Sequence, residues 1–201
     1  MPSIIKVDQI QSDLGTVNVS SNLQFSSGFT MRSPTFTGQA TIPTIDLTGG
    51  QIKFPATKVP SSDPNTLDDY EEGTWTPSFR AESSFSSITY NTRIGRYVKI
   101  GKLVVATCRV GIEDKTGGSS SIAVSGFPFT FWDAENFQAG AVEHYNFGSW
   151  PSNIFSIGAL SIGGTDYMNL LWNGSGTRTN VQVSSLVGGS GLTITVAYQI
   201  A

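Results

Sequence analysis

Residues 102–112 read KLVVATCRVGI, and this stretch decides the fold class. Every second side chain is predicted to line one face of a strand: Val104, Ala106, Cys108, Val110 and Ile112. Thr107 and Arg109 then lie on the opposite face. Because side chains of an extended strand alternate between two faces, this period of two predicts a β-strand that buries one face. On that face Cys108 is expected to act as a small apolar core residue.

Comparable stretches recur from Thr74 onward, rich in Val, Ile, Thr and aromatic residues. Gly-rich stretches that predict turns separate them: residues 101–102, 115–118, 163–166, 173–176 and 188–191. Many short antiparallel strands without a helical period predict an all-β fold. We predict an antiparallel β-sandwich of jelly-roll type for residues 74–201, with no helix of three turns.

The composition agrees with strands and turns and excludes several functions. Charged residues make up 13% of the 201 residues, about half the usual share. The net charge of −3 and the scattered Lys and Arg residues argue against nucleic-acid binding. No stretch approaches the roughly 18 apolar residues of a membrane span, and MPSIIKVDQIQ lacks the pattern of a secretory signal. A single cysteine excludes an internal disulfide and a thiolate metal cluster. We expect no metal site and no cofactor.

The first part of the chain has a different character. Six of the nine prolines lie at or before position 64, with short alternating apolar stretches such as GTVNV between them. Proline breaks helices and cannot donate to a sheet ladder. We therefore predict that residues 1–73 form an extended, Pro-rich N-terminal arm with short strands, which becomes ordered by packing against other chains. A disordered Ser/Thr-rich linker is the alternative.

The stretch TLDDYEEGTWTP, residues 66–77, gathers four carboxylates around one tyrosine. Glycoside hydrolysis needs two carboxylates held opposite each other across a sugar, and these are neighbours in a polar link. A calcium site needs six to eight oxygen ligands whose spacing wraps the ion, which DDYEE does not show. The favoured interpretation is a solvated or N-capping charge cluster, with Tyr70 and Trp75 packing inward.

Catalytic chemistry has little support in the sequence, and we predict that the protein is not an enzyme. His144 is the one histidine, and nothing in the sequence places a nucleophile beside it. A glycan-cleaving enzyme remains a third possibility and would need two facing carboxylates from one set: Asp114, Asp133, Glu135, Glu143 and Asp166.

Two stretches resemble virion proteins of tailed phages. NTLDDYEEGTWTPSF (65–79), followed by ITYNTRIGRYVKIGKLVVATCRV (88–110), resembles a module in which an acidic link leads into a strand pair and a small β-rich head. SPTFTGQATIPTIDLTGG (33–50) resembles segments of phage fibre shafts in which three chains wind together. The resemblance implies a trimeric virion surface protein, with residues 66–77 at the entry to the head.

Chain length favours one role among such proteins. At ~3.3 Å per residue, about 70 residues before the head reach at most ~230 Å, which is short for a fibre. We therefore expect a homotrimeric capsid decoration (cement) protein on the outer capsid surface that binds the major capsid protein. Four residues near the N-terminus are predicted to attach it: Ile4, Ile5, Val7 and Ile10. The alternative is a short tail fibre or tailspike that recognises host surface polysaccharide, with Trp150 and Tyr145 as candidate glycan contacts.

Overall fold

The computed structural model describes residues 49–57, 61–63, 65–67, 69–133, 138–148, 150–176 and 178–200. The chain divides into two compact units, Met1–Gln51 and Ile52–Ala201. Most of the predicted N-terminal arm, including the four predicted attachment residues, lies outside the described residues. Residues 51–54 (QIKF), whose alternation also predicts a short strand, are described and form none. The boundary between residues 73 and 74 stays a prediction, and the first strand runs across it.

The described part of the second unit is built from antiparallel strands. The strands are β1 (Tyr70–Trp75), β2 (Ser78–Ile100), β3 (Leu103–Ser125), β4 (Ala139–Phe147), β5 (Ile154–Ser161), β6 (Tyr167–Gly174), β7 (Arg178–Asn180) and β8 (Leu186–Gln199). One short 3-10 helix, η1 (Val183–Ser185), is the one helical element among the described residues. Every strand pairing in this part of the chain is antiparallel, so the all-β antiparallel prediction is confirmed.

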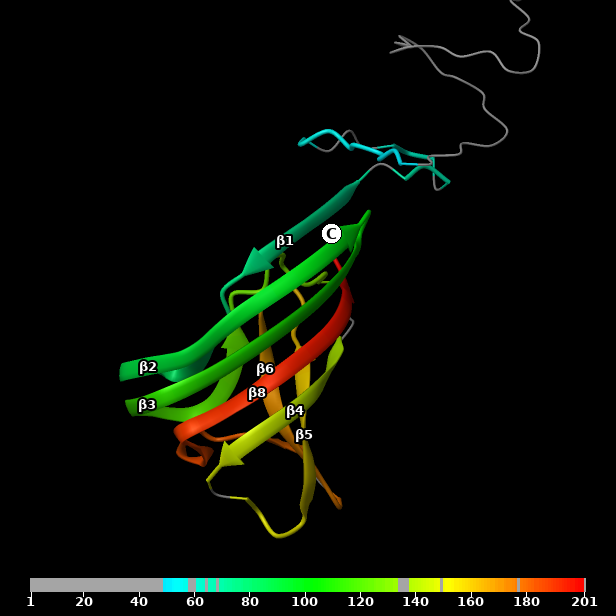
Figure 1. Ribbon diagram of the computed structural model, residues 1–201. Coiled ribbons are helices and arrows are strands. Elements are labelled where there is room, and N and C mark those ends of the chain that lie inside the picture. Colours follow the sequence, from blue (N-terminus) through cyan, green and yellow to red (C-terminus); the bar gives the residue numbers. More distant parts are fainter. Residues whose placement is uncertain are drawn as a thin grey trace, which may run out of the picture. The chain divides into compact units, whose positions relative to one another are not determined.

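The strands form a single sheet that closes on itself. Their order is β1-β2-β3-β8-β4-β5-β6-β7, and a further pairing of β3 with β6 joins the two layers. The strands β3, β8, β4, β5 and β6 therefore form a barrel, which β1 and β2 extend on one side. Figure 1 shows β5 and β6 behind the layer that contains β2, β3, β8 and β4. The two layers of the predicted sandwich are thus parts of one sheet, with the core between them.

The predicted alternation along KLVVATCRVGI is confirmed. The five side chains predicted to face inward are at most 3% exposed, whereas Thr107 and Arg109 are exposed. Tyr198, Leu192 and Ile194 of β8 are buried against them, as β8 pairs with residues 103–111 of β3. Removal of this apolar surface from water, at about 25 cal/mol per Å², is the main favourable contribution to folding.

Two of the five predicted turns are wrong. Residues 115–118 lie inside β3, where Gly117 and Gly118 have φ of +68° and +76°. The register between β2 and β3 shifts in this region. Residues with a left-handed backbone bend a strand without ending it, and β3 bends here because it leaves β8 and reaches β6.

Residues 188–191 likewise lie within β8, where Gly189 has φ of +80°. The side-chain amide of Asn146 donates a hydrogen bond to the carbonyl oxygen of Gly188 (2.9 Å), which stabilises the irregular pairing with β4. The remaining three predicted turns coincide with chain reversals between β2 and β3, β5 and β6, and β6 and β7.

The stretches EEGTWTP and IGRYVKI fit each other as strand partners. In the β1–β2 register Gly73 faces Tyr97, and Trp75 faces Gly95. Each glycine is covered by the opposing ring: an added Cβ would lie 2.5 Å from the ring of Tyr97 at Gly73 and 2.5 Å from the indole of Trp75 at Gly95. The two glycines therefore provide the space in which the two aromatic rings lie flat across the strands.

Gly95→Ala is expected to lower the free energy of unfolding by ~1–3 kcal/mol, because overpacking forces the neighbouring side chain to move. The indole of Trp75 has little room to do so, since its ring centroid lies 4.5 Å from that of Phe127. Gly158→Ala is the matched control, because its new Cβ would come within 3 Å of the terminal amide nitrogen of Asn173 alone. Urea denaturation measures the free energy of unfolding of both variants. Equal values for Gly95→Ala and Gly158→Ala would contradict the close packing of Trp75 over Gly95.

Candidate interaction surface

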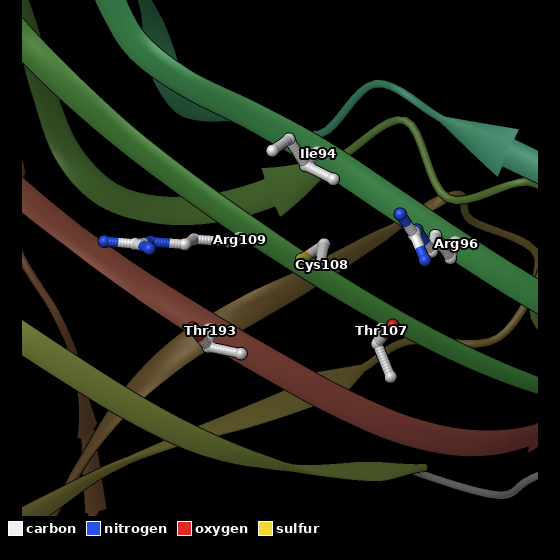
Figure 2. Close-up of a pocket in the computed structure, with 6 residues that line it drawn as sticks. All are labelled: Ile94, Arg96, Thr107, Cys108, Arg109 and Thr193. Carbon is white, nitrogen blue, oxygen red and sulfur yellow. The ribbon is translucent and has the colours of Figure 1, made fainter.

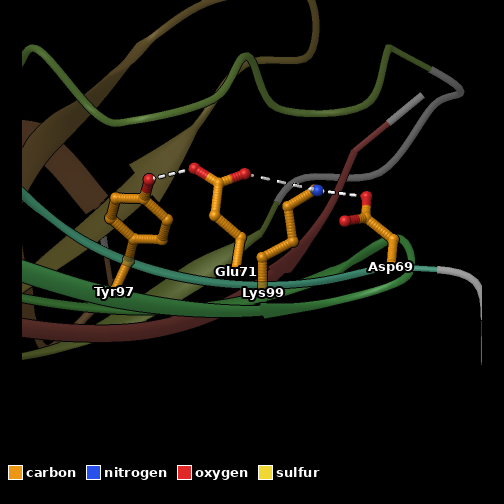
Figure 3. Close-up of polar contacts among 4 residues, drawn as sticks. All are labelled: Asp69, Glu71, Tyr97 and Lys99. Atoms are coloured by element: carbon orange, nitrogen blue, oxygen red, sulfur yellow. Dashed lines mark hydrogen bonds and ion pairs between the residues drawn. The ribbon is translucent and has the colours of Figure 1, made fainter. Parts of the chain in front are cut away.

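The acidic stretch contains β1, and its side chains hold β1 against β2. Glu71 faces Lys99 in the β1–β2 register, and the ammonium group of Lys99 donates a hydrogen bond to Asp69. A carboxylate oxygen of Glu71 lies 3.7 Å from the same ammonium, and its other oxygen accepts a hydrogen bond from the hydroxyl of Tyr97. Figure 3 shows the four side chains in one continuous row. Two of the four carboxylates of this stretch, Asp69 and Glu71, therefore have structural partners in the sheet.

Lys99 is 7% exposed, which is unusual for a lysine. Its ammonium lies 5.3 Å from the ring centroid of Phe129, and Tyr97 packs edge-on against the same ring at 5.3 Å. The row therefore also connects β1 and β2 to the segment that follows β3. A buried charge requires a paired partner, so the role of this group is to hold the edge strand in place.

The prediction for the aromatic residues of this stretch was correct for Trp75 and wrong for Tyr70. Trp75 is 9% exposed and belongs to the core. Tyr70 is 39% exposed, because it alternates with Glu71 along β1 and therefore points to the opposite face. Its hydroxyl donates to Glu72, and its ring centroid lies 6.0 Å from that of Phe54.

Alkaline pH is expected to test the Tyr97–Glu71 contact. The hydrogen bond to Glu71 raises the pKa of Tyr97 from 10.0 to about 12, with smaller contributions from burial and from the charge of Glu71. A raised pKa stabilises the fold fully below pH 10, and this stabilisation is lost as pH rises to about 12. Tyr97→Phe should lose less stability than the wild type across that interval, as measured by urea denaturation. Equal losses would contradict the assignment.

The outward side chains of β1, β2, β3, β8 and β4 form a surface that we call the outer face. At one end Tyr70 faces Ile100, which faces Leu103, and in the adjacent row Val98 faces Val105. These five side chains are 38% to 48% exposed, and we call them the apolar patch. Isolated apolar side chains are common on protein surfaces, but contiguous ones on three neighbouring strands mark a contact surface.

The next rows of the outer face carry charged and polar side chains of both signs, together with the exposed Ile94. Arg96 faces Thr107, and in the following row Arg109 faces Ile94 on one side and Thr193 on the other. With Cys108 they line a shallow hollow of about 320 Å³. Figure 2 shows Arg96 and Arg109 on opposite sides of this hollow. Neither guanidinium makes an ion pair with any residue that the structure describes.

Carboxylates also project from the outer face. Glu72 lies in the row of Val98, and Glu143 of β4 lies in the row of Arg109 and Thr193. The outer face therefore combines an apolar patch with two cationic and two anionic side chains. Such a surface is suited to a specific protein contact rather than to a chemical reaction.

The two candidate glycan contacts do not lie on a common face. Tyr145 is on the outer face, where its hydroxyl lies against Gly191 of β8 and Gly111 of β3. Trp150 packs against His144, whose side chain points to the opposite side of β4, and against Trp172 (ring centroids 4.8 and 4.7 Å apart). Each is 38% exposed, and a role in glycan binding stays a prediction for both.

The carboxylates considered for glycan cleavage are spread over the fold. Asp114 lies on β3, Glu143 on β4, and Asp166 in the turn before β6. Asp133 follows Trp132, with its side chain beside Gly164 of the same turn, and Glu135 lies outside the described residues. The hollows at Arg96 and at Phe79 are not lined by two carboxylates. Among the described residues, no group of three or more His, Cys, Asp or Glu side chains is placed to hold a metal ion.

No helix in this part of the chain has the length and apolar character of a membrane span.

The comparisons with known proteins give one similar fold. No protein-family model matches the sequence, and no curated protein matches it. The crystal structure of the Dettilon tailspike protein (gp208) is similar, with a TM-score of 0.53 and 16% sequence identity. The match covers 65% of this chain and 24% of that chain, so this chain spans about a quarter of the tailspike's length. What the two share is the fold.

Proposed function

We propose that this protein is a non-enzymatic structural protein of a phage virion, assembled as a homotrimer and exposed at the virion surface. The observation that carries the proposal is the outer face, an exposed surface of mixed apolar and charged side chains built on a closed barrel. The fold shared with a tailspike protein supports it, as does the resemblance of residues 65–110 to modules of tailed-phage virion proteins.

Within the virion, we favour the tail. The fold shared with a tailspike protein favours a tail fibre or tailspike over a capsid decoration protein. A fold can serve unrelated functions, so the comparison supports this choice without deciding it. The role is then that of a short tail fibre or tailspike, which contacts host surface polysaccharide. Attachment to the major capsid protein through Ile4, Ile5, Val7 and Ile10 belongs to the decoration alternative.

Copy number per virion tests the proposal. Quantitative mass spectrometry of purified virions that carry this protein should give a count matching the few tail positions, relative to the major capsid protein. A count near that of the shell protein, or a simple fraction of it, would overturn the tail assignment in favour of capsid decoration. Absence of the protein from purified virions would overturn the virion function altogether.

A further inference from the structure

The apolar patch is exposed to solvent in the single chain. Tyr70, Val98, Ile100, Leu103 and Val105 project from three adjacent strands on the solvent side of the sheet. Val104 and Ala106 already fill the inner side of the same strand, so the apolar residues at 103 and 105 are not needed for the core. Burying several such side chains against a partner removes apolar surface from water, which favours association.

From this surface we infer that the end of the outer face that holds the apolar patch is the contact between copies of the chain. The inference rests on the homotrimer of the proposed function and names the surface that forms it. Three features of the described residues favour a second copy as the partner.

The first feature is the place where the chain enters the barrel. Tyr70 is the first residue of β1 and a member of the patch, and Phe54 of the preceding segment packs against its ring. The segments preceding the three barrels are expected to run together in the trimer. Three barrels that are joined at Tyr70 then have their apolar patches at the point where they come closest, which favours contact between these patches.

The second feature is the charge on the outer face. Arg96 and Arg109 have no ion-pair partner among the described residues, and the same face carries Glu72 and Glu143. In a closed ring of three, each contact is heterologous, so one part of the face meets a different part in the next copy. A surface with both signs of charge can therefore pair with itself, and unpaired arginines of one copy meet carboxylates of the next.

The third feature is a hollow next to the patch. Leu103 borders a depression of about 370 Å³ whose other lining residues are Trp132, Gln138, Ala197, Tyr198 and Gln199. Trp132 is 40% exposed and is therefore accessible to a partner. Tryptophan is among the residues that contribute most to the binding energy of protein contacts. The hollow offers a place for an apolar side chain of the neighbouring copy beside the patch.

Thiol labelling of the full-length chain tests the inference. Val98 in the patch is 38% exposed, and Val187 is 37% exposed. Val187 lies at the start of β8, whereas the patch borders the end of β8 at Gln199, so Val187 lies outside the contact that we infer. The variants Val98→Cys and Val187→Cys therefore start from matched exposure, and Cys108 is buried in both. In the assembled protein, maleimide should label Val98→Cys at least about 10-fold more slowly than Val187→Cys, because the centre of an interface excludes water. On dilution to monomers the two rates should converge.

Association provides the second measurement. Val98→Glu is expected to shift the monomer–trimer equilibrium, followed by analytical ultracentrifugation, toward monomer, whereas Val187→Glu should leave it unchanged. Circular dichroism verifies that both variants fold. Labelling of Val98→Cys as fast as Val187→Cys in a trimer would overturn the inference while the virion function stands. A monomeric wild type would overturn the inference and the homotrimer, and the copy-number measurement would still decide the virion location.

Discussion

Tyr198→Ala is expected to lower the free energy of unfolding by ~3–5 kcal/mol, the cost of removing a large buried aromatic ring. Tyr198 is 1% exposed and is among the largest fully buried side chains. Its ring centroid lies 4.3 Å from that of Phe131 and 6.2 Å from that of Phe127. The cavity would therefore open where β8 meets the segment that follows β3. Urea denaturation followed by tryptophan fluorescence, at one fixed protein concentration, measures the loss.

Tyr198→Phe is the control for this prediction. It keeps the ring and removes the hydroxyl, which donates a hydrogen bond to the carbonyl oxygen of Phe129 (3.3 Å). Loss of one such bond costs about 0.5–1.5 kcal/mol. The phenylalanine variant should therefore retain most of the stability. If the alanine variant were as stable as the wild type, the assignment of Tyr198 to the centre of the core would be wrong.

Lys99→Met is expected to cost about 3 kcal/mol, because removing one partner of a buried ion pair leaves the other charge uncompensated. The side chains of Lys99 and Asp69 are 9% and 12% exposed. Without the ammonium group, the carboxylates of Asp69 and Glu71 would lie near each other with no cation between them. The midpoint of urea denaturation should fall accordingly.

Two further variants make this prediction specific. The double variant Asp69→Leu with Lys99→Met should regain most of the stability, because an apolar pair can replace a buried ion pair at little cost. Lys102→Met removes an exposed lysine from the neighbouring turn and should change stability by no more than about 0.5 kcal/mol. Equal effects of Lys99→Met and Lys102→Met would show that the buried pair does not stabilise β1.

The sequence predicts the strands of this fold better than their connections. Alternation in residues 102–112 correctly separates inward from outward side chains, because a strand with one face in a core has a period of two. The same reasoning fails at Gly117 and Gly189. Glycine can adopt a positive φ in a chain reversal and in a strand bend alike. Which of the two forms depends on whether the strand finds a new partner further along the chain. That partner is distant in the sequence.

The candidate interaction surface was less predictable. Val104 and Val105 are both apolar, so the outward position of Val105 is hidden within an apparently continuous apolar run. The alternation of Val98 and Ile100 with Tyr97 and Lys99 in GRYVKI is the signal for this outward apolar face, because Val98 pairs with Val105 and Ile100 with Leu103. The burial of Lys99 was not predictable, because it depends on Phe129 and on two carboxylates that come together in the folded sheet.

The position of β8 between β3 and β4 has a consequence for biosynthesis. β3 is made early, but residues 103–111 obtain their second hydrogen-bonded neighbour from β8, the last described strand to leave the ribosome. Until then the edge of β3 is unpaired, and pairing between strands so distant in sequence is slow. An open edge of this kind favours pairing with other nascent chains. Slower translation through β4 to β7 should therefore lower the yield of correctly folded protein more than slower translation of β1.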